Sequence, residues 1–144
     1  MSRDNAYGAL LARLQSASGL TAMLTYARTY YHWDDVRCPQ PALLVLAENQ
    51  TPLTQSNRPT VLQLQAHVVI YFKNQDPSIQ TDTIANNFAD AIANALRVQP
   101  GEQGQDYHTT LGGAVRRAWV TDTAIFQGIP LDQSMVMVTV EMLL

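Results

Sequence analysis

Residues 60–73 read TVLQLQAHVVIYFK, and an apolar residue stands at every second position. The even-numbered positions from 62 to 72 are all apolar, whereas Gln63, Gln65 and His67 occupy odd-numbered positions. Because successive side chains of a strand point to opposite faces, this alternation predicts a β-strand with one buried face. A strand of this length would extend roughly 43 Å at about 3.3 Å per residue, well beyond the usual length of about six residues. We therefore expect part of it to overhang the domain or to bend at a bulge.

Two further strands are expected before this one. Residues 24–33 (LTYARTYYHW) are rich in threonine and aromatic residues, which fit a pleated surface. Residues 42–47 (ALLVLA) form an unbroken apolar run that suits a strand covered on both faces and is too short for a helix. The acidic pair Asp34-Asp35 predicts a turn between them, and two nearby prolines keep the link extended.

Two amphipathic helices are also expected. In residues 4–18 apolar side chains recur at the i, i+3, i+4 and i+7 spacing, with a serine or an aspartate available as the N-cap. After Asp76-Pro77, which offers an N-cap and a first-turn proline, a second apolar stripe runs from Ile84 to Leu96. The many alanines of this second segment would let the helix pack close to a sheet.

The C-terminal part of the sequence predicts two more strands, at 114–127 and 134–144, and polar loops are expected at 52–60 and 101–110. The expected order is α-β-β-β-α-β-β. This order predicts an α+β fold, with a mostly antiparallel or mixed sheet of about five strands and two main helices packed on one face. The length of 144 residues predicts a single domain spanning residues 1–144.

The chain carries little charge. Charged residues make up 15% of the sequence, the formal net charge is −3, and only one lysine is present. A polar surface built mainly from Gln, Asn, Thr and Ser costs less to desolvate than a charged one, which favours contact between protein subunits. Because no basic stripe is available to follow a phosphate backbone, we expect no sequence-specific binding of nucleic acid.

Cys38 is the only cysteine, which excludes an internal disulfide and a multi-cysteine zinc site and fits a reducing compartment. The N-terminal residues are too polar for a signal peptide, and no window approaches the roughly 20 apolar residues of a membrane span. We therefore expect synthesis in the cytoplasm and no membrane partner.

The sequence shows no pattern typical of catalysis or cofactor binding. Asp34 and Asp35 are adjacent in an extended segment, so their side chains point apart and cannot easily share one proton. The three histidines lie on separate elements without the spacing of metal ligands. Leu111-Gly112-Gly113 lacks the lysine of a phosphate-binding loop and predicts a tight turn. We expect neither an enzyme nor a bound cofactor or metal.

The remaining candidates are contacts to other proteins. Gln63, Gln65 and His67, with the threonines at 121, 123 and 139, would form a weakly charged face opposite the helices, suited to a protein or a lumen. The long strand at 60–73 would overhang and could add to the sheet edge of a neighbour. Tryptophan and arginine are enriched at interfaces. We expect six such residues to take part in subunit contacts: Trp33, Asp34, Asp35, Arg116, Arg117 and Trp119.

Four pieces of the sequence stand in a defined order: YHWDDV at 31–36, QPAL at 40–43, TLGGAV at 110–115, and the valine-rich strand at the C-terminus. In their order and spacing they resemble the tail terminator (tail completion) proteins of long-tailed bacteriophages. The resemblance covers most of the chain. The segment at 50–59 and the second helix carry no distinctive match.

The resemblance implies a structural virion protein that forms a six-membered ring on the head-proximal end of a finished tail tube. Such a ring stops the addition of tube subunits and presents a surface to the head-tail connector. The implied partners are further copies of this chain, the tail tube protein and the connector or neck protein. DNA would pass through the ring, and an acidic chain would not bind its phosphate backbone tightly.

Two alternatives stay open. One is another phage neck or head-tail connector subunit of similar build. The other is a cytosolic small-ligand-binding domain or enzyme that uses the His67 face as its pocket. Stabilisation of the fold by metals or nucleotides in a thermal-shift screen would reveal this second alternative.

Overall fold

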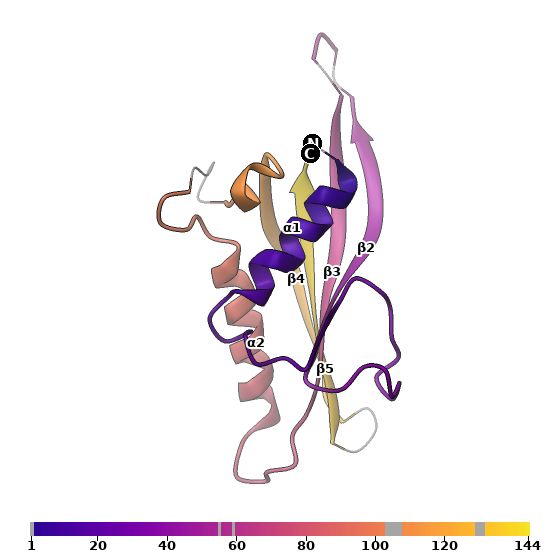
Figure 1. The fold of residues 1–144 in the computed structure, drawn as a ribbon, viewed down its shortest axis with the longest axis vertical. Helices are drawn as coiled ribbons and strands as arrows, with labels where there is room; N and C mark the ends of the chain where they lie inside the picture. Colours follow the sequence, from indigo (N-terminus) through magenta and orange to yellow (C-terminus); the bar gives the residue numbers. More distant parts are fainter. Residues whose placement is uncertain (1, 55, 59, 103–107, 129–131) are drawn as a thin grey trace.

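The computed structural model describes residues 2–54, 56–58, 60–102, 108–128 and 132–144. Within them one mixed sheet of five strands is covered on one face by two helices, which confirms the expected α+β fold and element order (Figure 1). The helices are α1 (Arg3–Gln15) and α2 (Thr81–Ala95), with a short 3-10 turn, η1 (Leu111–Gly113), before the last two strands. The strands are β1 (Thr25–Ala27), β2 (Ala42–Leu53), β3 (Val61–Lys73), β4 (Arg117–Phe126) and β5 (Gln133–Leu143).

Strand β3 lies in the middle of the sheet, whose order is β1-β2-β3-β5-β4. It pairs antiparallel with β2 from Val61 to Tyr71 and with β5 from Gln63 to Lys73. Both of its edges are therefore occupied, and the expectation that this strand adds to the sheet of a neighbour is wrong. The bulge expected in the strand at 60–73 lies instead in its neighbour β2, where the register shifts between Ala47 and Gln50. The β2–β3 hairpin does project beyond the rest of the structure (Figure 1).

The prediction of a strand at 24–33 is wrong beyond Ala27. Strand β1 has only three residues, which pair in parallel with β2, and residues 28–41 form an irregular segment that we call the β1–β2 loop. Side chains satisfy backbone groups in this loop: the Tyr71 hydroxyl donates to the Tyr31 carbonyl at 3.0 Å, and the Gln40 amide donates to the Trp33 carbonyl at 2.7 Å. These contacts come from tertiary structure, which overrides the local β propensity.

A bulge in β4 changes the face of one predicted residue. The register of β4 against β5 shifts between Val120 and Asp122, so that Thr123 lies opposite Val138, a buried residue on the helix-covered face. Thr123 therefore leaves the polar face on which strict alternation had placed it, because one extra residue reverses the side of every residue that follows.

The first helix has one of the two expected N-caps, whereas its end and the start of the second helix differ from expectation. The amide of Asn5 donates to the Ser2 hydroxyl at 3.0 Å, which makes Ser2 the N-cap of α1. The second helix begins at Thr81, so the prediction that it starts at Asp76-Pro77 is wrong. Asp76 instead belongs to a preceding turn, in which its carboxylate accepts a hydrogen bond at 2.9 Å from the amide of Ser78.

The two faces of the sheet bury clusters of different size. The main core lies between the sheet and the helices and includes Leu10, Leu64 and Ile92, each fully buried. On the opposite face the β1–β2 loop covers a smaller cluster built around Cys38, Leu44 and Tyr71. Neither helix within the described residues is long and apolar enough to cross a membrane.

Replacing Ile92 with alanine tests the main core. Because the Ile92 side chain is fully buried between α2 and the sheet, we expect a loss of about 2–5 kcal/mol in the free energy of unfolding, measured by urea denaturation. Ile79 is 45% exposed, and Ile79→Ala is the matched control, expected to cost less than about 1 kcal/mol. Equal losses in the two variants would contradict the packing described above.

Candidate functional site

An ion pair and a ring contact join side chains at the tip of the β1–β2 loop. The guanidinium of Arg37 donates to both carboxylate oxygens of Asp35, at 3.1 and 2.8 Å, and lies 5.3 Å from the centre of the Tyr31 ring. The side-chain and backbone hydrogen bonds from Arg37 lower the pKa of Asp35 to about 2, so this carboxylate stays ionised at neutral pH. Asp35, which we expected at a subunit contact, therefore also shapes its own loop.

The base of the same loop is tied to the sheet by an amide pair. Gln40 and Gln133 donate to each other at 2.8 and 2.9 Å, and the Gln133 amide also donates to the carbonyl of Phe72 at 3.2 Å. Gln133 is almost fully buried, so its hydrogen bonds offset the cost of removing the amide from water. The base of the loop is therefore anchored to the sheet, whereas the contacts at its tip lie within the loop itself.

This anchored loop displays apolar side chains to solvent. Val36 is 93% exposed and Tyr30 is 63% exposed, whereas Trp33 packs partly against the smaller cluster. Asp34 is exposed beside them and contacts His32 at 2.5 Å. Sequence reasoning had singled out Trp33 and Asp34 but not Val36, since nothing in a sequence distinguishes a valine that points to solvent.

The predicted basic and aromatic residues lie at the opposite edge of the sheet. The Arg117 guanidinium stands 4.7 Å from the centre of the Trp119 ring, Arg116 is exposed beside them, and the Trp119 ring lies 5.9 Å from that of His108. A cavity of about 540 Å³ opens here, between the end of α2 and β4, and we call it the α2–β4 groove. Its lining is mostly apolar: Ala93, Leu96, Arg97, Val98, His108, Trp119 and Val120.

Gln63, Gln65 and His67 form a third group, on the open face of the sheet. The Gln63 amide donates to Glu141 at 2.6 Å, Gln65 accepts from the side chain of Asn49 at 3.4 Å, and His67 lies 3.6 Å from Glu48. The structure thus divides the nine candidate residues among two sheet edges and one face, and does not gather them into one site. Arg97 and Val98 were missed, because they follow the end of a helix and carry no periodic signal.

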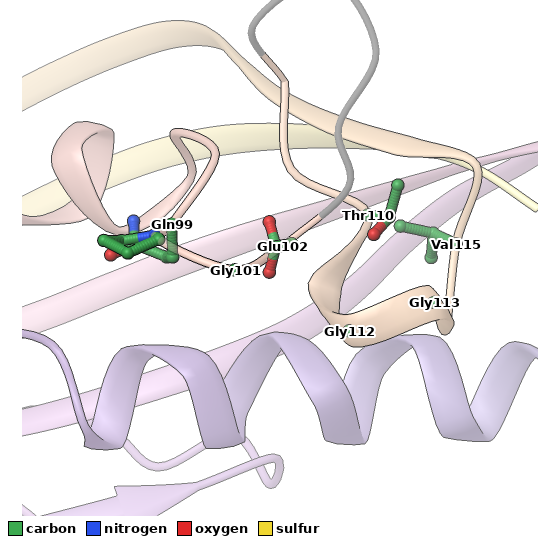
Figure 2. A pocket seen from close by; sticks show the side chains of 8 residues that line it. Gln99, Gly101, Glu102, Thr110, Gly112, Gly113 and Val115 are labelled. Carbon is green, nitrogen blue, oxygen red and sulfur yellow. The ribbon is translucent and has the colours of Figure 1, made fainter.

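A second cavity, of about 610 Å³, lies between residues 99–102 and the turn at Gly112-Gly113 (Figure 2). Glu102 lines it, but its carboxylate is bound by the guanidinium of Arg13 and the hydroxyl of Thr109. Burial alone would raise the pKa of Glu102, and the hydrogen bonds from Thr109 and Arg13 outweigh burial and lower it. Arg13 also donates to the carbonyl of Ala95 at 3.0 Å, so this network joins α1 to the end of α2.

These groups have the properties of structural contacts. Glu102 is engaged by two partners, and burial raises the pKa of the Cys38 thiol, which disfavours its reactive thiolate form. Within the described residues, no three His, Cys, Asp or Glu side chains come together in a way that could hold a metal ion. The arrangement is best suited to protein contacts at the sheet edges.

Comparisons with known proteins add one finding on the fold. Neither the scan against family models nor the search of curated proteins found a match. Among solved structures, the fold is similar to a chain from the virion of a native gene transfer agent particle, with a TM-score of 0.59 and 12% sequence identity. The similarity covers 99% of this chain and 98% of that chain, so the whole architecture is shared.

The lowered pKa of Glu102 predicts a pH-dependent stability. A carboxylate whose folded pKa lies below its unfolded value of about 4.3 contributes stability that is fully present above that value and is lost as the pH falls through the folded pKa. Glu102→Gln should therefore be less stable than the wild type at pH 7, and the difference should be smaller at pH 3, as measured by urea denaturation. Asp90→Asn, at an exposed position on α2, is the control and should follow the wild type at both pH values.

Proposed function

We propose that this protein is a structural virion protein whose copies assemble head to tail into a closed ring. The observation that carries the proposal is the asymmetry of the two sheet edges. One edge presents Val36 and Asp34 on an anchored loop, and the other presents an apolar groove beside Arg97 and Arg117. Different surfaces at opposite sides of one subunit generate rings when the rotation between neighbours closes.

The particular ring that we propose is a tail terminator. It is a hexamer on the head-proximal end of a phage tail tube, where it ends tube polymerisation and offers the joining surface for the head connector. Two independent likenesses support it: the sequence motifs at 31–43 and 110–115 resemble tail terminators, and the fold is similar to a chain of a virion. The role is structural rather than catalytic, and it places the protein in the virion tail.

The charge of the chain is compatible with DNA passing through such a ring. The net charge of −3 and the scarcity of lysine leave little to hold a phosphate backbone. Gln63 and Gln65 on the open face are uncharged, and each is hydrogen-bonded to a neighbouring side chain. A weakly charged subunit of this kind suits packing against protein and contact with a lumen.

The proposal predicts six-fold rings. Negative-stain electron microscopy and mass photometry of the purified protein at high concentration should show closed rings of six times the chain mass of 16.0 kDa. Added to tail tubes and to tail-less heads separately, the protein should bind tube ends and stop their growth. Binding to heads alone would instead favour a neck or connector subunit, and binding to neither would contradict the proposal.

A further inference from the structure

We propose that Val36 of one copy inserts into the α2–β4 groove of the next copy, with Asp34 placed against Arg97. This contact rests on the proposed ring, and it names the two surfaces that would build it. The partner is a second copy of this chain, because both halves of the contact are present on every copy. The inference goes beyond the ring itself by specifying which side chains carry the assembly.

The inserting side is a loop tip with defined local contacts. Val36 is flanked by Asp35 and Arg37, and the ion pair between these two neighbours closes the loop directly beneath it. The amide of Cys38 also donates to the carbonyl of Asp35 at 3.0 Å, which fixes the backbone on the C-terminal side of the tip. The Val36 side chain is 93% exposed, so nearly all of its apolar surface is available for burial in a contact.

The receiving side offers an apolar cavity with a positive rim. Leu96, Val98 and Val120 line the α2–β4 groove, whose volume of about 540 Å³ exceeds that of a valine side chain and leaves room for part of the loop. Arg97 is exposed at the same place, and the Arg117 guanidinium lies over the Trp119 ring that lines the groove. These cations complement Asp34, whose side chain is 61% exposed on the projecting loop.

The two surfaces lie where a head-to-tail contact requires them. The loop follows β1 at one edge of the sheet, and the groove borders β4 at the other edge, with β2, β3 and β5 between them (Figure 1). A loop cannot reach across its own sheet to fill this groove. The groove of each copy is therefore available to the loop of a different copy, which is the condition for a heterologous interface.

Pairing with a neighbouring copy through β3 or through the β2 edge is a poorer route. β3 is hydrogen-bonded on both sides, and β1 covers only the first three residues of β2. The rest of that β2 edge carries a bulge between Ala47 and Gln50 and a proline at position 52, two features that resist the addition of a further strand. Side-chain insertion avoids this obstacle.

The first test uses a charged residue at the tip. Val36→Glu should weaken association at least about tenfold in sedimentation velocity, because it would place a carboxylate in the apolar groove. The matched control is Ile79→Glu, the same kind of change at an exposed apolar residue away from both surfaces, and it should associate as the wild type does. Circular dichroism should show that both variants keep their fold, since both positions are exposed.

The second test reverses the proposed charges. Asp34→Arg and Arg97→Glu should each weaken association about tenfold, and the double variant should recover most of the loss, because the pair is restored with opposite sign. Arg58→Glu, at an exposed position in the β2–β3 connection, is the control for the second change. Single losses without recovery in the double variant would count against a direct pairing of Asp34 with Arg97.

The third test traps the contact covalently in a Cys38→Ser background. A protein with Val36→Cys, mixed with one carrying Val98→Cys, should form a disulfide-linked dimer under mild oxidation, and the double variant should form a ladder of linked chains. Val36→Cys mixed with Ile79→Cys is the control pair and should stay unlinked.

The outcomes separate this contact from the proposed ring. Rings that form normally with Val36→Glu, together with no cross-link, would overturn the contact and leave the ring standing. A specific Val36–Val98 cross-link in open oligomers, with no ring on tube ends, would support the contact and overturn the terminator role. The absence of self-association under all conditions would overturn both.

Discussion

The structure depends on the pairing of β3 along both of its edges. From Gln63 to Tyr71 this strand is held by β2 on one side and by β5 on the other, so segments distant in sequence are joined around it. Its alternating side chains then define the two faces of the sheet. The apolar face packs against α1 and α2. The other face carries the polar group of Gln63, Gln65 and His67 and the smaller cluster under the β1–β2 loop.

Two polar networks hold the elements at the two sheet edges. The Gln40–Gln133 amide pair ties the base of the β1–β2 loop to β5, and the network of Arg13, Glu102 and Thr109 ties α1 to the segment after α2. In each anchor the polar side chains exchange hydrogen bonds with water for hydrogen bonds with one another. Both places are partly buried, where a polar group without a hydrogen-bond partner would destabilise the fold. One anchor holds the projecting loop, and the other lies next to the elements that border the α2–β4 groove. Both surfaces of the proposed ring contact are therefore next to hydrogen bonds made within one chain.

Local pattern predicted the elements that bury an apolar face. The alternation at 60–73, the stripe from Ile84 to Leu96 and the valine-rich C-terminal segment each led to an element of the correct type, because burial imposes a period on the sequence. Prediction was wrong where other forces act. Residues 28–33 have β propensity but are held by side-chain hydrogen bonds, and Asp76-Pro77 forms a turn before the helix rather than its start.

The sequence by itself determined the class of fold, the two helices and the central strand, since hydrophobic periodicity is a local property of the chain. It also named Trp33, Asp34, Arg117 and Trp119 as contact candidates from residue type alone. Only the tertiary structure decided that the tryptophan and aspartate at 33–34 lie at the opposite edge of the sheet from Arg117 and Trp119. It also decided that Thr123 lies on the helix-covered face. Strand order, bulges and exposure come from pairing between distant segments. For the same reason the sequence could not mark Val36, an ordinary valine, as exposed: among the described residues, folding buries most large apolar side chains and leaves that of Val36 93% exposed.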